Sequence, residues 1–195
     1  MGRSLSRLVI CLIFLAACQP APQRTVFSEP TYSHLGQIRL DVGKIDVLEA
    51  YQPSFAAPNV EHAFPVSPMT VARAWARQRL IAVGSIDSGR AVFTIREASV
   101  VDTELPVTEG VRGAFRVDQS RRYDALLTVQ LEIFGSGGGQ RGWVNVTARR
   151  SQTAPEGITL DGRDRLWFAM TEALILDMNR ELEARIYEVF GSFLR

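Results

Sequence analysis

Residues 123–134 carry an apolar side chain at every second position, mostly with polar side chains between them, and this run constrains the fold more than any other part of the chain. The apolar side chains occupy the odd positions, namely Tyr123, Ala125, Leu127, Val129, Leu131 and Ile133. Successive side chains of a strand point to opposite faces of the sheet. The pattern therefore predicts a strand with one buried face and one face that is largely in water.

A glycine-rich segment, residues 135–142, follows this strand, and alternation resumes over residues 143–150. Two alternating runs around such a segment predict an antiparallel hairpin. The glycines resemble a phosphate-binding loop only in composition. That loop needs a Lys-Ser/Thr pair and a following helix, whereas Gln140-Arg141 and a strand pattern follow here.

Two further segments show strand periodicity. Residues 38–47 alternate with a change of phase at Gly43, which predicts one strand with a bulge at the glycine. Residues 90–101 alternate with a second change of phase after Ile95. Each segment is expected to bury one face against the same core.

Two segments show helical spacing. Ser67 is a suitable N-cap for a first helix that we expect to end at Gly84. Apolar residues recur every four positions over residues 161–190, and Thr159 or Asp161 can cap this second, long helix. Such a stripe drifts slowly around the helix, so the helix is expected to cross a twisted sheet.

The order of these elements defines the expected fold. Residues 37–195 should form a single α+β domain with an antiparallel or mixed sheet of about four strands in β-α-β-β-β-α order. One short helix and one long C-terminal helix would pack on the sheet. Hydrophobic residues make up 46% of the 195 residues, which is enough for one core of this kind.

The N-terminus has the features of a secretory signal peptide. Arg3 and Arg7 precede an apolar run over residues 8–15. That run is shorter than the ~20 apolar residues that cross a bilayer, and it suits the apolar core of a signal peptide. Residues 1–17 are therefore predicted to be removed.

The segment Leu15-Ala16-Ala17-Cys18 resembles the lipobox of bacterial lipoproteins. The resemblance implies cleavage just before Cys18, a diacylglycerol group on its sulfur and an acyl chain such as palmitate on the new amine. Two or more chains hold a protein stably on a membrane. Gln19, where an aspartate would retain the protein at the inner membrane, favours the outer membrane. The expected location is the bacterial cell envelope, facing the periplasm. An ordinary signal peptide and a buried apolar segment are the alternatives.

Residues 18–36 carry the lipidated cysteine and a tether rich in proline, with Pro20, Pro22 and Pro30. No strand or helix period appears, which indicates an extended linker. Such a linker reaches at most about 60 Å. The folded domain would then stand away from the membrane.

Catalytic, metal and cofactor sites are not expected. His34 and His62 lack the spacing of metal ligands. Glu61 and His62 form either an acid/base pair or, as we favour, an ordinary loop pair. The chain is thus expected not to be an enzyme.

Two arginine pairs, Arg121-Arg122 and Arg149-Arg150, are the candidate contacts for an anionic ligand, because arginine suits phosphate. A solvated face is the alternative interpretation. The net charge is only +1, with 22 basic and 21 acidic residues. No nucleic-acid partner is therefore expected.

Three tryptophans, Trp75, Trp143 and Trp167, are predicted to lie in the core. Large exposed apolar side chains often mark sites of interaction. A tryptophan that proved exposed would therefore mark a surface for a partner.

The lipobox at Cys18, the proline-rich tether and the element order together resemble two groups of periplasm-facing lipoproteins. These are the auxiliary lipoproteins of ABC-type lipid transporters and the lipopolysaccharide-assembly lipoproteins. The resemblance implies a domain that binds an envelope protein or a lipid and catalyses nothing. The expected function is an accessory docking or scaffolding component of a transport or assembly complex. A lipid- or lipopolysaccharide-binding module is the alternative.

Overall fold

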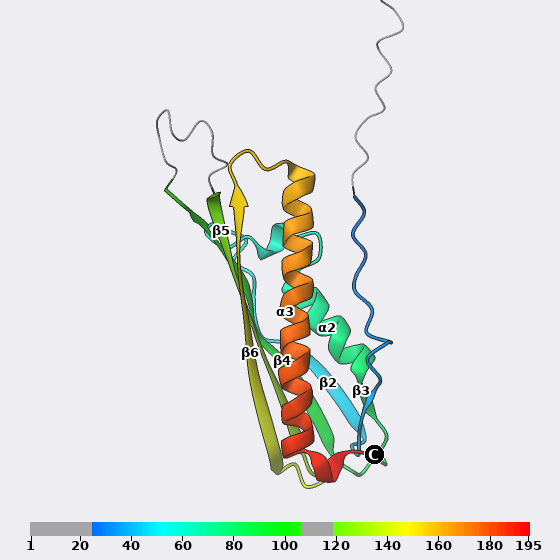
Figure 1. Cartoon of the computed structure of the whole chain (residues 1–195). Helices are drawn as coiled ribbons and strands as arrows, with labels where there is room; N and C mark the ends of the chain where they lie inside the picture. The colour runs from blue at the N-terminus through cyan, green and yellow to red at the C-terminus, as the bar shows by residue number, and fades with distance from the viewer. Residues whose placement is uncertain (1–24, 107–118) are drawn as a thin grey trace, which may run out of the picture.

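The computed structural model of this protein describes residues 25–106 and 119–195, which form two layers (Figure 1). One layer is a four-stranded sheet, and the other contains two α-helices and a small two-stranded sheet. The α+β class, the mixed sheet and the long C-terminal helix are all as predicted. The predicted signal peptide and Cys18 lie outside the described residues.

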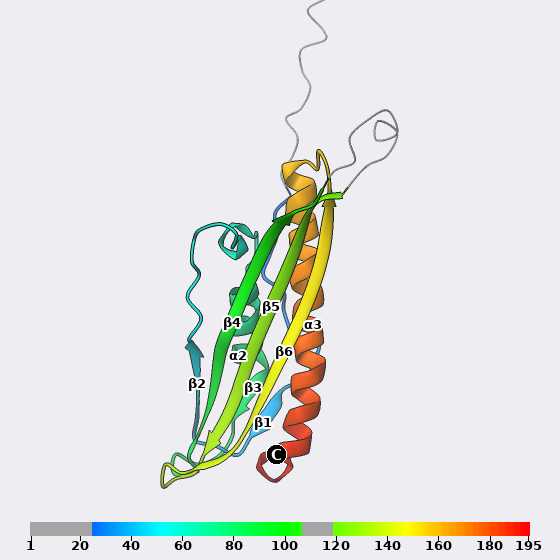
Figure 2. The same ribbon diagram turned by 90° about the vertical axis from the view of Figure 1, so that its left-hand side faces the viewer.

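The main sheet has the strand order β2-β4-β5-β6. Its strands are β2 (Lys44–Glu49), β4 (Arg90–Glu104), β5 (Gln119–Phe134) and β6 (Gln140–Pro155). β2 runs parallel to β4, and the other neighbours are antiparallel. The helices cover one face, and Figure 2 looks onto the other, open face.

The predicted hairpin forms one side of this sheet, with β6 at its edge. Val129 of β5 lies opposite Val146 of β6, and Leu131 lies opposite Val144. The apolar odd positions of β5 from Tyr123 onward are buried. Both strands extend beyond the predicted ends, because their polar ends continue the hydrogen-bonded ladder.

The phase change predicted in the third alternating segment is a bulge in β4. The register against β5 shifts between Ile95 and Glu97. Phe93 and Ile95 before the shift are fully buried, as are Ala98 and Val100 after it. An extra residue at this point keeps both halves of the strand facing the same core.

The first alternating segment is two strands rather than the single bulged strand we predicted. β1 (Ile38–Leu40) pairs in parallel with β3 (Leu80–Ala82) in the small sheet, and β2 joins the main sheet. Gly43 lies at the crossing, where an added Cβ would be 2.7 Å from the carbonyl oxygen of Ser85. The glycine therefore allows two chain segments to cross closely.

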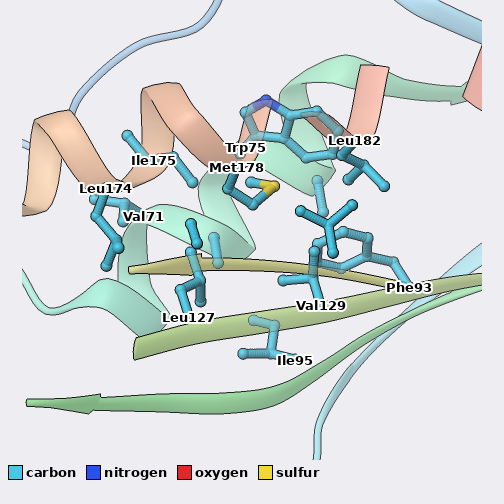
Figure 3. Close-up of a cluster of buried hydrophobic side chains, with 14 of the residues drawn as sticks. Val71, Trp75, Phe93, Ile95, Leu127, Val129, Leu174, Ile175, Met178 and Leu182 are labelled. Atoms are coloured by element: carbon cyan, nitrogen blue, oxygen red, sulfur yellow. The ribbon is translucent and has the colours of Figure 1, made fainter. Parts of the chain in front are cut away.

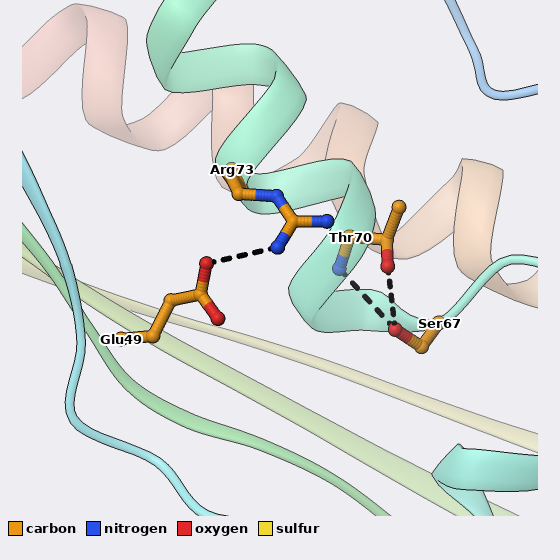
Figure 4. A network of polar contacts seen from close by, with 4 residues as sticks. All are labelled: Glu49, Ser67, Thr70 and Arg73. Atoms are coloured by element: carbon orange, nitrogen blue, oxygen red, sulfur yellow. Dashed lines mark hydrogen bonds and ion pairs between the residues drawn. The ribbon is translucent and has the colours of Figure 1, made fainter.

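Helix α2 (Pro68–Arg79) starts where predicted and ends earlier. The Ser67 hydroxyl accepts a hydrogen bond from the Thr70 backbone N–H at 3.2 Å (Figure 4). The helix ends at Arg79, not near Gly84, because the next three residues form β3 and pair with β1. Long-range pairing thus overrides the local signal for the helix end.

Helix α3 (Leu160–Val189) crosses the sheet on the β5–β6 side, and Thr159 caps it by accepting from the Gly162 N–H at 3.0 Å. Its apolar stripe packs on the buried side chains of the strands, with Leu174, Met178 and Leu182 close to Leu127 and Val129 (Figure 3). The predicted helix and its stripe are confirmed.

A polar group in the core joins the two helices. Asn179 of α3 accepts from the Trp75 indole N–H at 2.7 Å and from Arg79 at 3.1 Å. Arg79 is only 2% exposed and also pairs with Glu183 at 3.1 Å. The buried guanidinium charge therefore has a partner, as buried charges require.

The described part of the predicted tether, residues 25–36, has no helix or strand but packs on the domain. Tyr32 is 4% exposed, and its backbone N–H donates to Gln78 at 2.8 Å. Burial raises the pKa of the Tyr32 hydroxyl well above its ordinary value. These residues therefore belong to the folded body and do not form a free linker.

We call the end where α3 begins the upper end (residues 102–106, 119–123 and 153–161) and the opposite end the lower end (residues 84–90, 134–140 and 189–195), as oriented in Figure 1. At the lower end a short 3-10 turn (Gly191–Phe193) follows α3. The Arg195 N–H then donates to the Arg39 carbonyl at 3.1 Å, which ties the C-terminus to β1.

Candidate docking surface on the open face of the sheet

The lower half of the open face carries apolar side chains where a solvated sheet face would be polar. Val92, Trp143 and Leu48 point to this side from β4, β6 and β2. Val92 lies opposite Asp46 on one neighbouring strand and Glu132 on the other, and Glu132 lies opposite Trp143. The register therefore assembles one row of side chains across all four strands.

Val92 and Leu48 belong to the lining of a hollow of about 780 Å³, and Trp143 lies next to Glu132 of that lining. The hollow is lined by residues of β2, β4 and β5 and by one arginine of α2, namely Ile45, Asp46, Val47, Leu48, Arg77, Arg90, Val92, Thr94, Arg96, Glu132 and Phe134. Val92 and Thr94 are each 7% exposed although no helix covers this face. Their long neighbours shield them, so the hollow has a partly apolar floor.

Arginine and carboxylate side chains border this floor. Arg90 lies over the Phe134 ring, with its guanidinium carbon 5.1 Å from the ring centre. Arg96 donates to the side-chain oxygen of Gln130. The lining holds three arginines against two carboxylates, so its formal charge is +1. The hollow can receive apolar groups and pair with an acidic group.

Trp143 is 57% exposed on this face, so the prediction of a core position is wrong for this tryptophan. Trp75 and Trp167 are buried as predicted. The difference follows from register. Trp143 has the opposite phase to Val144 and Val146 of β6, whose side chains enter the core. The alternation along the strand could have predicted this exposure, because Trp143 occupies a position that points to the open face.

Three of the four candidate arginines have carboxylate partners. Arg121 makes a two-fold contact with Asp102 at 2.9 and 2.6 Å, and this hydrogen-bonded carboxylate raises the pKa of Arg121. Arg122 pairs with Asp124 at 2.8 Å. An anionic ligand at these two positions would have to compete with the carboxylates.

The second arginine pair is divided between the two faces. Arg150 pairs with Asp177 of α3 at 2.5 Å, at the edge of the helix layer. Arg149 lies opposite Leu126 on the open face and has no ion-pair partner within the described residues. The structure does not bring the four arginines into one site. Their role as ligand contacts remains a prediction.

Glu61 and His62 also diverge. Glu61 lies in a short 3-10 turn, is 2% exposed, and accepts from the Tyr51 hydroxyl at 2.8 Å and from the Val100 N–H at 3.2 Å. His62 is exposed, with its ring 5.5 Å from that of Phe55. Burial, and then the bond to Glu61, raises the pKa of Tyr51.

The buried carboxylate of Glu61 has a structural role. β2 pairs only with the first half of β4, up to Ile95. Beyond that point the Val60 N–H donates to the Val100 carbonyl at 2.9 Å, and Glu61 accepts from the Val100 N–H. The turn therefore completes the sheet edge where no strand is available, which satisfies backbone groups that would otherwise be unpaired.

Comparisons with known proteins leave this surface unassigned. No family model and no curated protein matches the chain. A minor lipoprotein from Acinetobacter baumannii is 13% identical with a TM-score of 0.33, over 73% of this chain and 94% of that chain. PelC from Paraburkholderia phytofirmans, solved as a dodecamer, is 10% identical with a TM-score of 0.21, over 76% and 91%. Similarity at this level carries no argument about fold or function.

In the part of the chain that the structure describes, no helix combines the length and apolarity needed to cross a membrane.

Proposed function

We propose that this chain is a non-enzymatic lipoprotein of the bacterial envelope. Its domain would dock an envelope protein of a transport or assembly complex through the lower half of the open face. The lipobox-like segment ending at Cys18 supports the anchor. The observation that carries the docking role is the exposure of Leu48, at 51%, at a hollow with a partly apolar floor, and of Trp143, at 57%, on the strand next to it.

Physical reasons favour this surface as a protein interface. Tryptophan and arginine contribute more than most residues to the strongest points of protein interfaces. Leu48 lines the hollow from β2, and Trp143 of β6 lies beyond Glu132 on the other side. Arg90 and Arg96 lie between them on β4. A partner with apolar side chains and one or two carboxylates would match this arrangement.

An anionic lipid, including lipopolysaccharide, is the second candidate. Arg90, Arg96 and Arg77 line the same hollow. A phosphate could pair with one of these arginines while an acyl chain covered Val92. The protein partner is preferred because Asp46 and Glu132 share the hollow and would repel a phosphate.

The anchor is tested by labelled palmitate in a bacterial host. The wild-type chain should incorporate the label and fractionate with membranes. Cys18→Ser should lose both properties, because the acylated sulfur is the proposed attachment. Label that persists in Cys18→Ser, or its absence from the wild type, would contradict the anchor.

Docking is tested by placing a photo-crosslinking amino acid at position 143 in cells. A matched control places it at position 176, because Leu176 is 49% exposed and belongs to α3, in the other layer of the domain. Position 143 should give one discrete protein adduct that position 176 does not. Leu48→Asp should abolish the adduct. A lipid adduct would favour the second candidate, and identical results at both positions would contradict a docking role for this face.

A further inference from the structure

We propose that the upper end of the domain lies against the membrane and that the lower open face points away from it. This orientation rests on the proposed lipid anchor at Cys18. It adds to that proposal a specific surface for the bilayer.

Thr25 is held at the start of α3. Its backbone N–H donates to Asp161 at 3.2 Å, and its hydroxyl accepts from Arg165 at 3.1 Å. Asp161 and Arg165 form an ion pair at 2.7 Å. The three residues form a clamp between the N-terminal segment and the first turns of the helix.

The segment then follows the body. The Phe27 ring lies 5.0 Å from that of Phe168 on α3, and Tyr32 is buried further along. Residues 25–36 therefore pack along the domain, whereas the pattern of prolines suggested a linker that extends to residue 36. Little length remains between the domain and the proposed anchor.

That length sets a limit on distance. Seven residue steps separate positions 18 and 25. At about 3.5 Å for each step, Cys18 lies no more than about 25 Å from Thr25. Helix α3 has 30 residues, so its two ends are about 45 Å apart. The anchor can therefore reach the upper end easily, while the lower end lies beyond the length of the tether.

The surface around the clamp suits a membrane interface. Val26 is 88% exposed, and Leu160 at the first position of α3 is 62% exposed. Charges near them cancel, since Asp161 and Asp164 accompany Arg163 and Arg165. Contact would therefore depend on the anchor and on these apolar side chains, and not on anionic lipids.

The test uses the lipidated full chain in vesicles of phosphatidylethanolamine and phosphatidylglycerol that contain a headgroup nitroxide lipid. Glu156→Cys at the upper end and Ser136→Cys at the lower end each receive a fluorophore, because both residues are exposed. The proposed cleavage and acylation would leave no other free thiol, since the chain has only Cys11 and Cys18.

Fluorescence at position 156 should be quenched several-fold more than at position 136. The same difference should be found in vesicles without phosphatidylglycerol. Inserting twenty Gly/Ser residues after Gln19 should reduce the quenching at position 156. Equal or reversed quenching, or no effect of the insertion, would overturn the orientation. Incorporation of labelled palmitate tests the proposed anchor separately from the proposed orientation. Quenching is therefore compared only for protein that carries the label. A chain that does not take up the label would overturn both proposals.

Discussion

The two ends of the domain are built from different kinds of contact. At the lower end, backbone packs closely on backbone, and Gly43, Gly84 and Gly89 allow neighbouring segments to approach. At the upper end, side chains hold irregular segments in place, with Glu61 at the sheet edge and Asp161 at the start of α3. Substitutions should therefore act differently at the two ends. Added atoms should harm the lower end, whereas lost polar groups should harm the upper end.

The largest expected effect is at Gly89, which has φ of +89° and whose added Cβ would lie 2.1 Å from the Phe134 carbonyl oxygen. Gly89→Ala should lower the free energy of unfolding by at least about 3 kcal/mol, because the backbone strain and the clash add. Urea unfolding measures the change.

Gly138 provides the matched control for Gly89. It also has a positive φ, +78°, but nothing lies within 4 Å of its added Cβ. Gly138→Ala should therefore cost only about 1 kcal/mol, from backbone strain alone. Equal losses for the two variants would show that the close approach at Gly89 adds nothing to the cost of the backbone strain.

The next effect is at Glu61. Glu61→Ala would leave the Val100 N–H and the Tyr51 hydroxyl without their partner, and we expect a loss of about 3 kcal/mol in the free energy of unfolding. Glu49 is the control, because it forms an ion pair with Arg73 at 3.0 Å in which each side chain is about one third exposed (Figure 4). Glu49→Ala should cost less than about 1 kcal/mol. A smaller loss at Glu61 than at Glu49 would contradict the role of its carboxylate in the sheet edge.

The smallest effect concerns the clamp at Thr25. Hydrogen bonds from Thr25 hold the pKa of Asp161 below its ordinary value of 3.8. Folding lowers this pKa, so the contribution of the clamp is complete above pH 3.8 and is lost as the pH falls through the lowered value. Protection of the Thr25 amide from hydrogen exchange should fall in acid, while the urea midpoint at neutral pH should not change on Asp161→Asn.

Asp164 serves as the control for this last prediction, because it lies in the same turns of α3 and makes only a 3.8 Å contact with Arg163. Asp161→Asn should reduce protection of the Thr25 amide at neutral pH, and Asp164→Asn should leave it unchanged. The same loss of protection in both variants would indicate a general effect of charge at the helix start and would contradict a specific clamp between Thr25 and Asp161.

Much of the fold could be predicted because its signals are local. The odd positions of β5 and the four-residue stripe of α3 each report the buried face of one element. The errors arose where distant segments meet. Residues 80–82 leave the helix pattern because β1 offers a strand partner, and Gly43 marks a crossing between two sheets. Neither partner is visible in the local sequence.

The candidate docking surface shows the same division. Alternation in the sequence already places Val92 and Trp143 opposite to the core positions of their strands. Their position in one row, with Glu132 between them, depends on the register of β4, β5 and β6. The sequence pointed instead to the arginine pairs, because adjacent charges are conspicuous in a sequence, whereas the aspartates that pair with Arg121 and Arg150 lie far away along the chain.

The sequence by itself determined the long strands β4, β5 and β6, the starts of the two helices and the lipobox-like segment at Cys18, since periodicity and short motifs are properties of neighbouring residues. Only the tertiary structure decided which strands are partners, that Glu61 completes a sheet edge, and that residues from Thr25 onward already pack on the domain. Those outcomes depend on contacts between residues tens of positions apart, and these contacts form only when the chain folds.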